Sequence, residues 1–204
     1  MLPALHYEDD PPVCHFTGLA QAPATEFIDG KVSKFSTKAH PKAKGAGFSI
    51  KYPASWAAKE GERPNIVQRF VSESGKGLEN IIIITTSLPP QLPIGDSDLK
   101  ALFSPDGLKE MLPDSGKFIR GTSTKIEGFP AGILEFSLRE ARAGLEIDMH
   151  ITSILFLQGH TMVQVQCQVG FLSSKASELP SRIAAFRPLF QLVMNSILFD
   201  DKWK

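Results

Sequence analysis

The stretch ILEFSLREARAGLEIDMHITSILFLQGHTMVQVQCQV, residues 133–169, carries the strongest secondary-structure signal in the chain. Apolar and polar side chains alternate along three runs within it, and a period of two places them on opposite faces of a β-sheet. Turn signals at Ala143-Gly144 and Gln158-Gly159-His160 separate the runs. The stretch therefore predicts an antiparallel meander of three strands.

The pairing of these strands predicts which side chains share a face. Pairing the last two runs about Gly159 places His150 opposite Gln168 and Ile151 opposite Cys167. In that register the apolar sets of both runs lie on one face. Cys167 is then expected in the core as a small, unpaired apolar residue.

The same register predicts a polar row on the outer face of the meander. A loop at 141–144 places Glu135 opposite His150. The row is then formed by five residues: Glu135, Asp148, His150, Gln166 and Gln168. It is either a solvated sheet face or a polar recess beside a covering helix, able to bind a ligand or a partner's polar groups. In both cases the neighbouring carboxylates are expected to raise the pKa of His150.

The flanking sequence predicts further strands at residues 48–52, 66–71, 80–86 and 118–126. Four consecutive isoleucines at 81–84 are typical of a central strand that is covered on both faces. Short helices are expected after the N-caps Ser97 and Ser104. A longer amphipathic helix is expected over 183–197, where large apolar residues recur on one face.

The N-terminal part of the chain differs from the rest in composition. Residues 1–45 are rich in proline and show no lasting periodicity, so we expect an extended or disordered leader. Residues 46–204 are expected to form a single domain. Removal of residues 1–40 should then change the free energy of unfolding by less than about 1 kcal/mol.

Composition bounds the classes of function. The 204 residues include 22 acidic and 22 basic side chains, a formal net charge of zero. This balance argues against a nucleic-acid partner held by bulk electrostatics and against a polybasic membrane anchor. No apolar run approaches the ~18 residues of a membrane helix, so we do not expect an integral membrane protein.

No motif points to catalysis, a metal or a cofactor. The chain lacks the GxSxG pattern of a nucleophile elbow, and Ser74-Gly75-Lys76-Gly77 lacks the spacing of a phosphate-binding loop. The five histidines are scattered along the chain, and two cysteines cannot form a disulfide framework. We therefore expect no catalytic residues, no metal ligands and no cofactor.

Two phrases of the sequence carry a resemblance. The opening phrase GFSIKYPASW, residues 47–56, and the closing stretches FRPLF, residues 186–190, and NSILF, residues 195–199, resemble the PsbP proteins of photosynthetic complexes, the Mog-type Ran-binding proteins and bacterial DcrB-like proteins. The resemblance covers about residues 46–200. It implies an α+β fold in which about six antiparallel strands are flanked by helices on both faces, an α/β/α sandwich. It carries over no functional residue.

The resemblance and the missing motifs favour a non-enzymatic accessory or binding protein with a protein partner, and a monomer is the expected state. One alternative is a chaperone or adaptor for a secreted effector or another protein. A second alternative is a small-molecule binder. Residues 1–19 are not an intact signal peptide, so an exported or periplasmic location is favoured only if a signal has been removed, and a cytoplasmic one otherwise.

Overall fold

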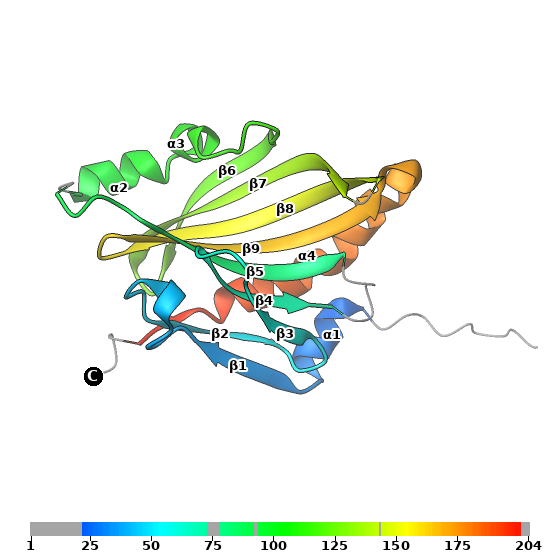
Figure 1. The fold of residues 1–204 in the computed structure, drawn as a ribbon, viewed down its shortest axis with the longest axis horizontal. Helices are drawn as coiled ribbons and strands as arrows, with labels where there is room; N and C mark the ends of the chain where they lie inside the picture. The colour runs from blue at the N-terminus through cyan, green and yellow to red at the C-terminus, as the bar shows by residue number, and fades with distance from the viewer. Residues whose placement is uncertain (1–21, 73–77, 92–93, 143, 201–204) are drawn as a thin grey trace, which may run out of the picture.

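Two antiparallel sheets form the framework of the computed structural model, which describes residues 22–72, 78–91, 94–142 and 144–200 (Figure 1). The larger sheet has seven strands in the order β3-β4-β5-β9-β8-β7-β6. Their bounds are β3 Ala57–Glu60, β4 Ile66–Val71, β5 Glu79–Ser87, β6 Lys117–Ile126, β7 Phe129–Arg142, β8 Leu145–Gln158 and β9 Thr161–Leu172. The predicted meander is confirmed as β7-β8-β9, and the sheet has more strands than the six expected.

The smaller sheet has the order β1-β2-β10, with β1 Val32–Ser36, β2 Phe48–Pro53 and β10 Leu198–Phe199. It joins segments from the two ends of the described chain, because β1 and β10 pair with opposite edges of β2. Phe48 and Ile50 of β2 are fully buried in the same core as the central strands of the larger sheet. The smaller sheet therefore packs on one face of the larger one.

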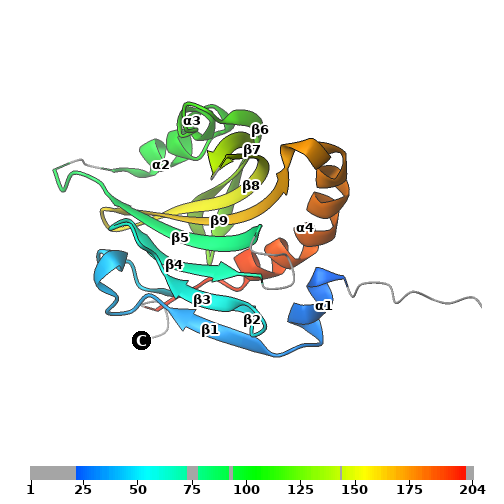
Figure 2. The ribbon, with the colours of Figure 1, turned by 45° about the vertical axis from the view of Figure 1, so that its right-hand side comes forward.

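Helices lie on both faces of the larger sheet, as the sandwich prediction requires (Figure 2). The bounds are α1 Pro23–Ile28, α2 Asp96–Leu102, α3 Pro105–Glu110 and α4 Leu179–Asn195, with 3-10 helices η1 Pro41–Ala43 and η2 Ser173–Glu178. The long helix α4 packs on one face together with the smaller sheet, whereas α2 and α3 pack over β6 and β7 on the other face. None of the described helices is long and apolar enough to cross a bilayer.

Two separate cores follow from this arrangement. The core below α4 contains inward-facing residues of β5 and β9, such as Ile83 and Cys167. The core below α2 and α3 contains residues of β7 and β8, such as Phe136 and Ile151. Gly132 allows the second core to close, because a Cβ atom at this position would lie 2.6 Å from Cδ2 of Leu108. Both faces of the meander are thus apolar over part of their length.

The two cores explain why the predicted register is wrong by one residue. His150 pairs with Val169 and Ile151 with Gln168, because a two-residue turn at Gly159 and His160 joins β8 to β9. Ile151 and Cys167 consequently lie on opposite faces. Between β7 and β8 the shift is two residues, with Glu135 opposite Thr152, so Glu135 and His150 still share one face, although it is the face of Cys167 and not the opposite one.

The N-terminal segment from residue 22 onward is folded, whereas we expected an extended or disordered leader up to residue 45. Helix α1, strand β1 and helix η1 fall within the range where we expected an extended leader. Phe27 and Phe35 pack against the core below α4, and Ala43 and Thr37 are buried. Residues 1–21 lie outside the described part of the chain, as do the predicted turn at 74–77 and Ala143.

Candidate functional site

The five residues of the predicted polar row do not lie on one face. The pairing of β7 with β8 places Glu135 and His150 on the same side of the sheet. Both side chains line a cavity with residues of α4, so this side faces α4. Gln166 and Gln168 lie on the opposite face, since the register of β9 is shifted by one. The structure therefore divides the predicted site into two: a small cavity below α4 and an open groove on the other face.

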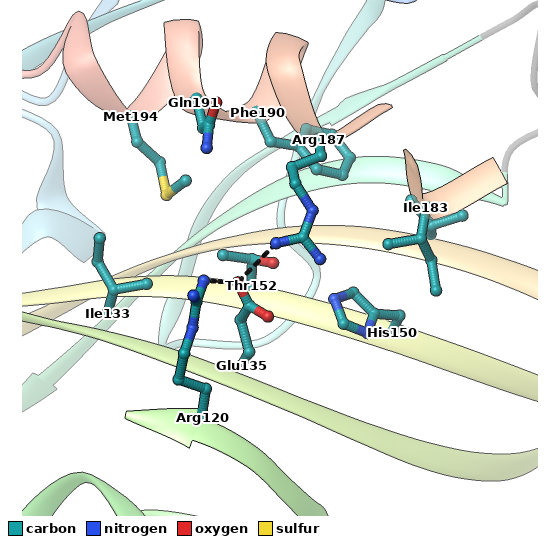
Figure 3. A pocket seen from close by; sticks show the side chains of 11 residues that line it. Arg120, Ile133, Glu135, His150, Thr152, Ile183, Arg187, Phe190, Gln191 and Met194 are labelled. Atoms are coloured by element: carbon teal, nitrogen blue, oxygen red, sulfur yellow. Dashed lines mark hydrogen bonds and ion pairs between the residues drawn. The ribbon is translucent and has the colours of Figure 1, made fainter. Parts of the chain in front are cut away.

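The cavity lies between α4 and the strands β6, β7, β8 and β9, and we call it the α4 cavity (Figure 3). Its volume is about 70 Å³. It is lined by polar and apolar side chains together: Arg120, Ile133, Glu135, His150, Thr152, Val169, Ile183, Arg187, Phe190, Gln191 and Met194. Two of the five residues of the predicted polar row, Glu135 and His150, line it.

Glu135 is the centre of an ion-pair network in the α4 cavity. Its Oε1 atom accepts a hydrogen bond from Nη2 of Arg120 at 2.7 Å and another from Nη1 of Arg187 at 3.3 Å. The carboxylate is buried, while the two arginine side chains remain about half exposed. Because Arg120 belongs to β6 and Arg187 to α4, Glu135 joins the helix to the edge of the sheet.

His150 is buried beside this network. Only 9% of its surface is exposed, and its ring makes no hydrogen bond to another residue in the described part of the chain. Burial lowers the pKa of His150, the nearby Glu135 carboxylate acts in the opposite direction, and Arg187 lowers it further. The expected rise in the pKa of His150 is therefore wrong, because loss of solvent outweighs the attraction of Glu135.

Asp148 lies on the same face but belongs to a different cluster. Nε and Nη2 of Arg139 donate to its two carboxylate oxygens at 2.6 Å and 3.1 Å. The hydrogen bond from Arg139 is the main cause that lowers the pKa of Asp148. The carboxylate is thus neutralised at the far end of β8 and does not line the α4 cavity.

A second buried carboxylate below α4, that of Glu79, was not predicted from the sequence. Glu79 at the start of β5 is fully buried and forms an ion pair with Arg182 of α4. The Arg182 guanidinium also lies 5.6 Å from the ring centroid of Phe171 and 5.7 Å from that of Phe186. No local pattern marks Glu79, because its partner lies 103 residues further along the chain.

The second part of the site is a groove on the face opposite α4. It encloses about 840 Å³, is open to solvent, and runs across β4, β5, β9, β8 and β7 beside the end of α3. We call it the glutamine groove. Its lining residues are Glu62, Arg63, Ile66, Arg69, Ile82, Ile84, Met111, Leu112, Pro113, Phe136, Leu138, Glu140, Ala141, Met149, Ile151, Gln164, Gln166 and Gln168.

The glutamine groove exists because α2 and α3 cover only the β6–β7 end of this face (Figure 1). Ile82 and Ile84 of β5 are therefore half-buried and line the groove, whereas Ile81 and Ile83 on the other side of the strand are fully buried. The isoleucine run predicted a strand covered by helices on both faces. That expectation is wrong for the groove side, where no described helix lies over β5.

The three glutamines of β9 form a row along the groove. Nε2 of Gln168 donates to Oε1 of Gln166 at 2.9 Å, and Nε2 of Gln164 donates to Oγ of Ser153 at 3.1 Å. These bonds leave the Nε2 group of Gln166 and the Oε1 atom of Gln164 without a hydrogen bond among the described residues. The row therefore presents a donor and an acceptor to whatever enters the groove.

The described residues contain no group of three or more His, Cys, Asp or Glu side chains placed to hold a metal ion. Cys167 is fully buried and free, as predicted, and burial raises the pKa of its thiol. A buried thiol with a raised pKa is a poor nucleophile. The other cysteine, Cys14, lies outside the described residues.

No family model matches the chain, and no curated protein matches it either. Among solved structures, cyanobacterial PsbP (CyanoP) from Synechocystis sp. PCC 6803 aligns with a TM-score of 0.53 and 14% identity, over 91% of this chain and 96% of that one. The Ran-binding protein Mog1p from Saccharomyces cerevisiae aligns with a TM-score of 0.50 and 13% identity, over 84% of this chain and 96% of that one. The chain has a PsbP-like fold.

A third solved structure is similar to a smaller degree. LpqN of Mycobacterium tuberculosis, described as involved in cell envelope biogenesis, aligns with a TM-score of 0.45 and 16% identity, over 83% of this chain and 92% of that one. The resemblance read from the opening and closing phrases is confirmed at the level of the fold. At these identities the PsbP-like fold does not identify the function.

Proposed function

We propose that this PsbP-like chain is a non-enzymatic accessory protein that binds an extended segment of a protein partner in the glutamine groove. The observation that carries the proposal is the groove itself, a broad surface of apolar, amide and charged side chains on a sheet face that no described helix covers. Half-buried apolar side chains that are surrounded by polar ones are typical of interaction sites. The α4 cavity, at about 70 Å³, has no room for a polypeptide.

The chemistry of the groove fits an extended polypeptide. Gln164, Gln166 and Gln168 recur at every second residue of one strand, a spacing of about 7 Å. The main chain of an extended peptide repeats at the same distance and offers both donors and acceptors to the glutamine amides. The apolar side chains beside the row, among them Ile82 and Met149, would contact the side chains of the peptide.

Two solved neighbours support a role of this class. One is a cyanobacterial PsbP protein, and the other is a protein that binds Ran. Neither neighbour supplies a residue for the groove, so the partner is described here by its chemistry alone. A chaperone or adaptor that holds an apolar segment would use the same groove, and the nature of the captured partner distinguishes the two roles.

Substitution on the floor of the groove tests the proposal. Ile82→Lys places an ammonium group on the apolar floor, from which the flexible side chain can reach solvent. When each variant is purified from native cells, the amount of partner recovered with Ile82→Lys should fall at least ten-fold. Recovery with Lys34→Glu, a charge change on exposed β1, should stay the same. Equal recovery of the same proteins by both folded variants would overturn the proposal. Fractionation of the same cells decides between an exported and a cytoplasmic location.

A further inference from the structure

The α4 cavity carries an excess of positive charge. Two guanidinium groups, of Arg120 and Arg187, face one carboxylate, of Glu135. Burial lowers the pKa of His150 and so favours its neutral form. Outside the cavity lining, the charge of Asp148 is neutralised by its ion pair with Arg139.

The charge of Glu79, which lies opposite Val169 on β5, is neutralised in the same way by Arg182. The local sum over the cavity lining is therefore about one positive charge. An uncompensated charge next to a buried space favours an anionic occupant.

Hydrogen-bond donors are also in excess in the cavity. A guanidinium carries five N–H groups, and Arg120 and Arg187 each use one, both on the same Oε1 atom of Glu135. His150 is nine-tenths buried and its ring makes no hydrogen bond among the described residues. The imidazole N–H of His150 is therefore available to an occupant of the cavity.

The positions of these groups point to one location. Figure 3 shows the Arg187 guanidinium beside the Glu135 carboxylate, with the His150 ring on the same side of the sheet and Ile183 above it. Thr152 lies on β8 directly opposite Glu135 and two residues from His150. Hydroxyl, imidazole and guanidinium donors thus surround the space from two strands and one helix.

The size of the space limits the occupant. A volume of about 70 Å³ is several times that needed for one water molecule, and it suits an ion of about three or four heavy atoms. Apolar side chains, including Ile183 and Met194, form the remaining wall. We propose that the α4 cavity binds a small free carboxylate, such as formate or acetate, with Arg187 as its charged partner and Thr152 and His150 as hydrogen-bond donors.

NMR of the full chain tests this proposal. The Cε1–H signal of His150, assigned with the variant His150→Gln, is titrated with sodium formate, sodium acetate and sodium benzoate against sodium chloride at equal ionic strength. Formate and acetate should produce a saturable shift, and saturation should raise the pKa of His150, because a bound anion favours the imidazolium form. Benzoate is too large for the cavity and should give only the shift produced by chloride.

Matched variants locate the site. Arg187→Gln should weaken the binding of acetate at least ten-fold, whereas Lys34→Gln, at an exposed position of β1, should leave it unchanged. A cavity that holds water alone would give no saturable shift with either small carboxylate, and that result would overturn the proposal. An equal shift with benzoate, or an unchanged shift in folded Arg187→Gln, would contradict it as well. None of these outcomes depends on the partner proposed for the glutamine groove.

Discussion

Oε1 of Glu135 on β7 accepts a hydrogen bond 3.3 Å long from Nη1 of Arg187 on α4, 52 residues away along the chain. The same oxygen accepts a second hydrogen bond from Arg120 of β6. A buried carboxylate thus connects the long helix to the outermost strand of the larger sheet. The contact has consequences for stability that are separate from any ligand.

Glu135→Gln should lower the free energy of unfolding by about 1–2 kcal/mol, because it removes the negative partner of two arginines. The value is below that of a fully buried pair, since both guanidinium groups are about half exposed and screened by solvent. Urea unfolding at pH 7 measures it. Glu146→Gln is the control, because Glu146 is exposed and 3.9 Å from Arg139, and a change below about 0.5 kcal/mol is expected there. Equal effects of the two substitutions would contradict the assignment.

The buried His150 should make stability depend on pH. Its pKa in the folded protein lies below the usual value of 6.5, so between these two values the unfolded chain binds more protons than the native one. This contribution to stability is therefore fully present above about pH 6.5 and is lost as the pH falls through the folded pKa.

His150→Gln should remove this part of the pH dependence, as measured by urea unfolding between pH 4 and pH 8. His160→Gln, at an exposed turn position, serves as the control and should leave the profile unchanged. A loss of stability on raising the pH from 6 to 8, abolished by His150→Gln, would show that the pKa is raised and that the burial argument is wrong.

The strands of the larger sheet could be predicted from the sequence because alternation is a local property. Residues 66–71 were predicted as a strand and form β4 with the same limits. The faces could not be predicted in the same way. Alternation shows that Ile151 and Cys167 each lie on an apolar side of their strand, but not that α4 covers one of these sides and α2 and α3 the other.

The candidate site was predicted in part for the same reason. Glu135 and His150 were correctly placed together, since a register shift of two residues preserves the face. Gln168 was placed wrongly, since the shift between β8 and β9 is one residue. Arg187 was missed, because an exposed arginine on an amphipathic helix has no local feature that reveals a buried partner on a distant strand.

The N-terminal segment should contribute to stability from residue 32 onward. Phe35 of β1 packs against the core, with its ring centroid 5.7 Å from that of Phe70 in an edge-to-face arrangement. Phe35→Ala should therefore lower the free energy of unfolding by about 1–3 kcal/mol, less than for a fully buried phenylalanine. Lys34→Ala, at the exposed position beside it, should cost less than about 0.5 kcal/mol. If Phe35→Ala costs no more than this control, β1 is not part of the folded core.

Cys167 should react slowly with thiol reagents in the native protein. Its side chain is fully buried and burial raises the pKa of the thiol, so little thiolate is accessible. In a Cys14→Ser background, labelling by a disulfide reagent should proceed only as fast as the protein unfolds. Cys167→Ser should destabilise the fold by about 1–3 kcal/mol, because it buries a hydroxyl group among apolar side chains. Rapid labelling under native conditions would show that β9 is accessible on the α4 face.

The glutamine groove, on the face opposite α4, is the surface that we propose binds a partner. Photo-crosslinking in native cells tests it most directly, with a photoreactive amino acid at Gln166 in the groove in one strain and at Lys34 on exposed β1 in another. A discrete crosslinked product is expected from position 166, absent from position 34, and lost when Ile82→Lys is added. A product from position 34 with none from position 166 would contradict it.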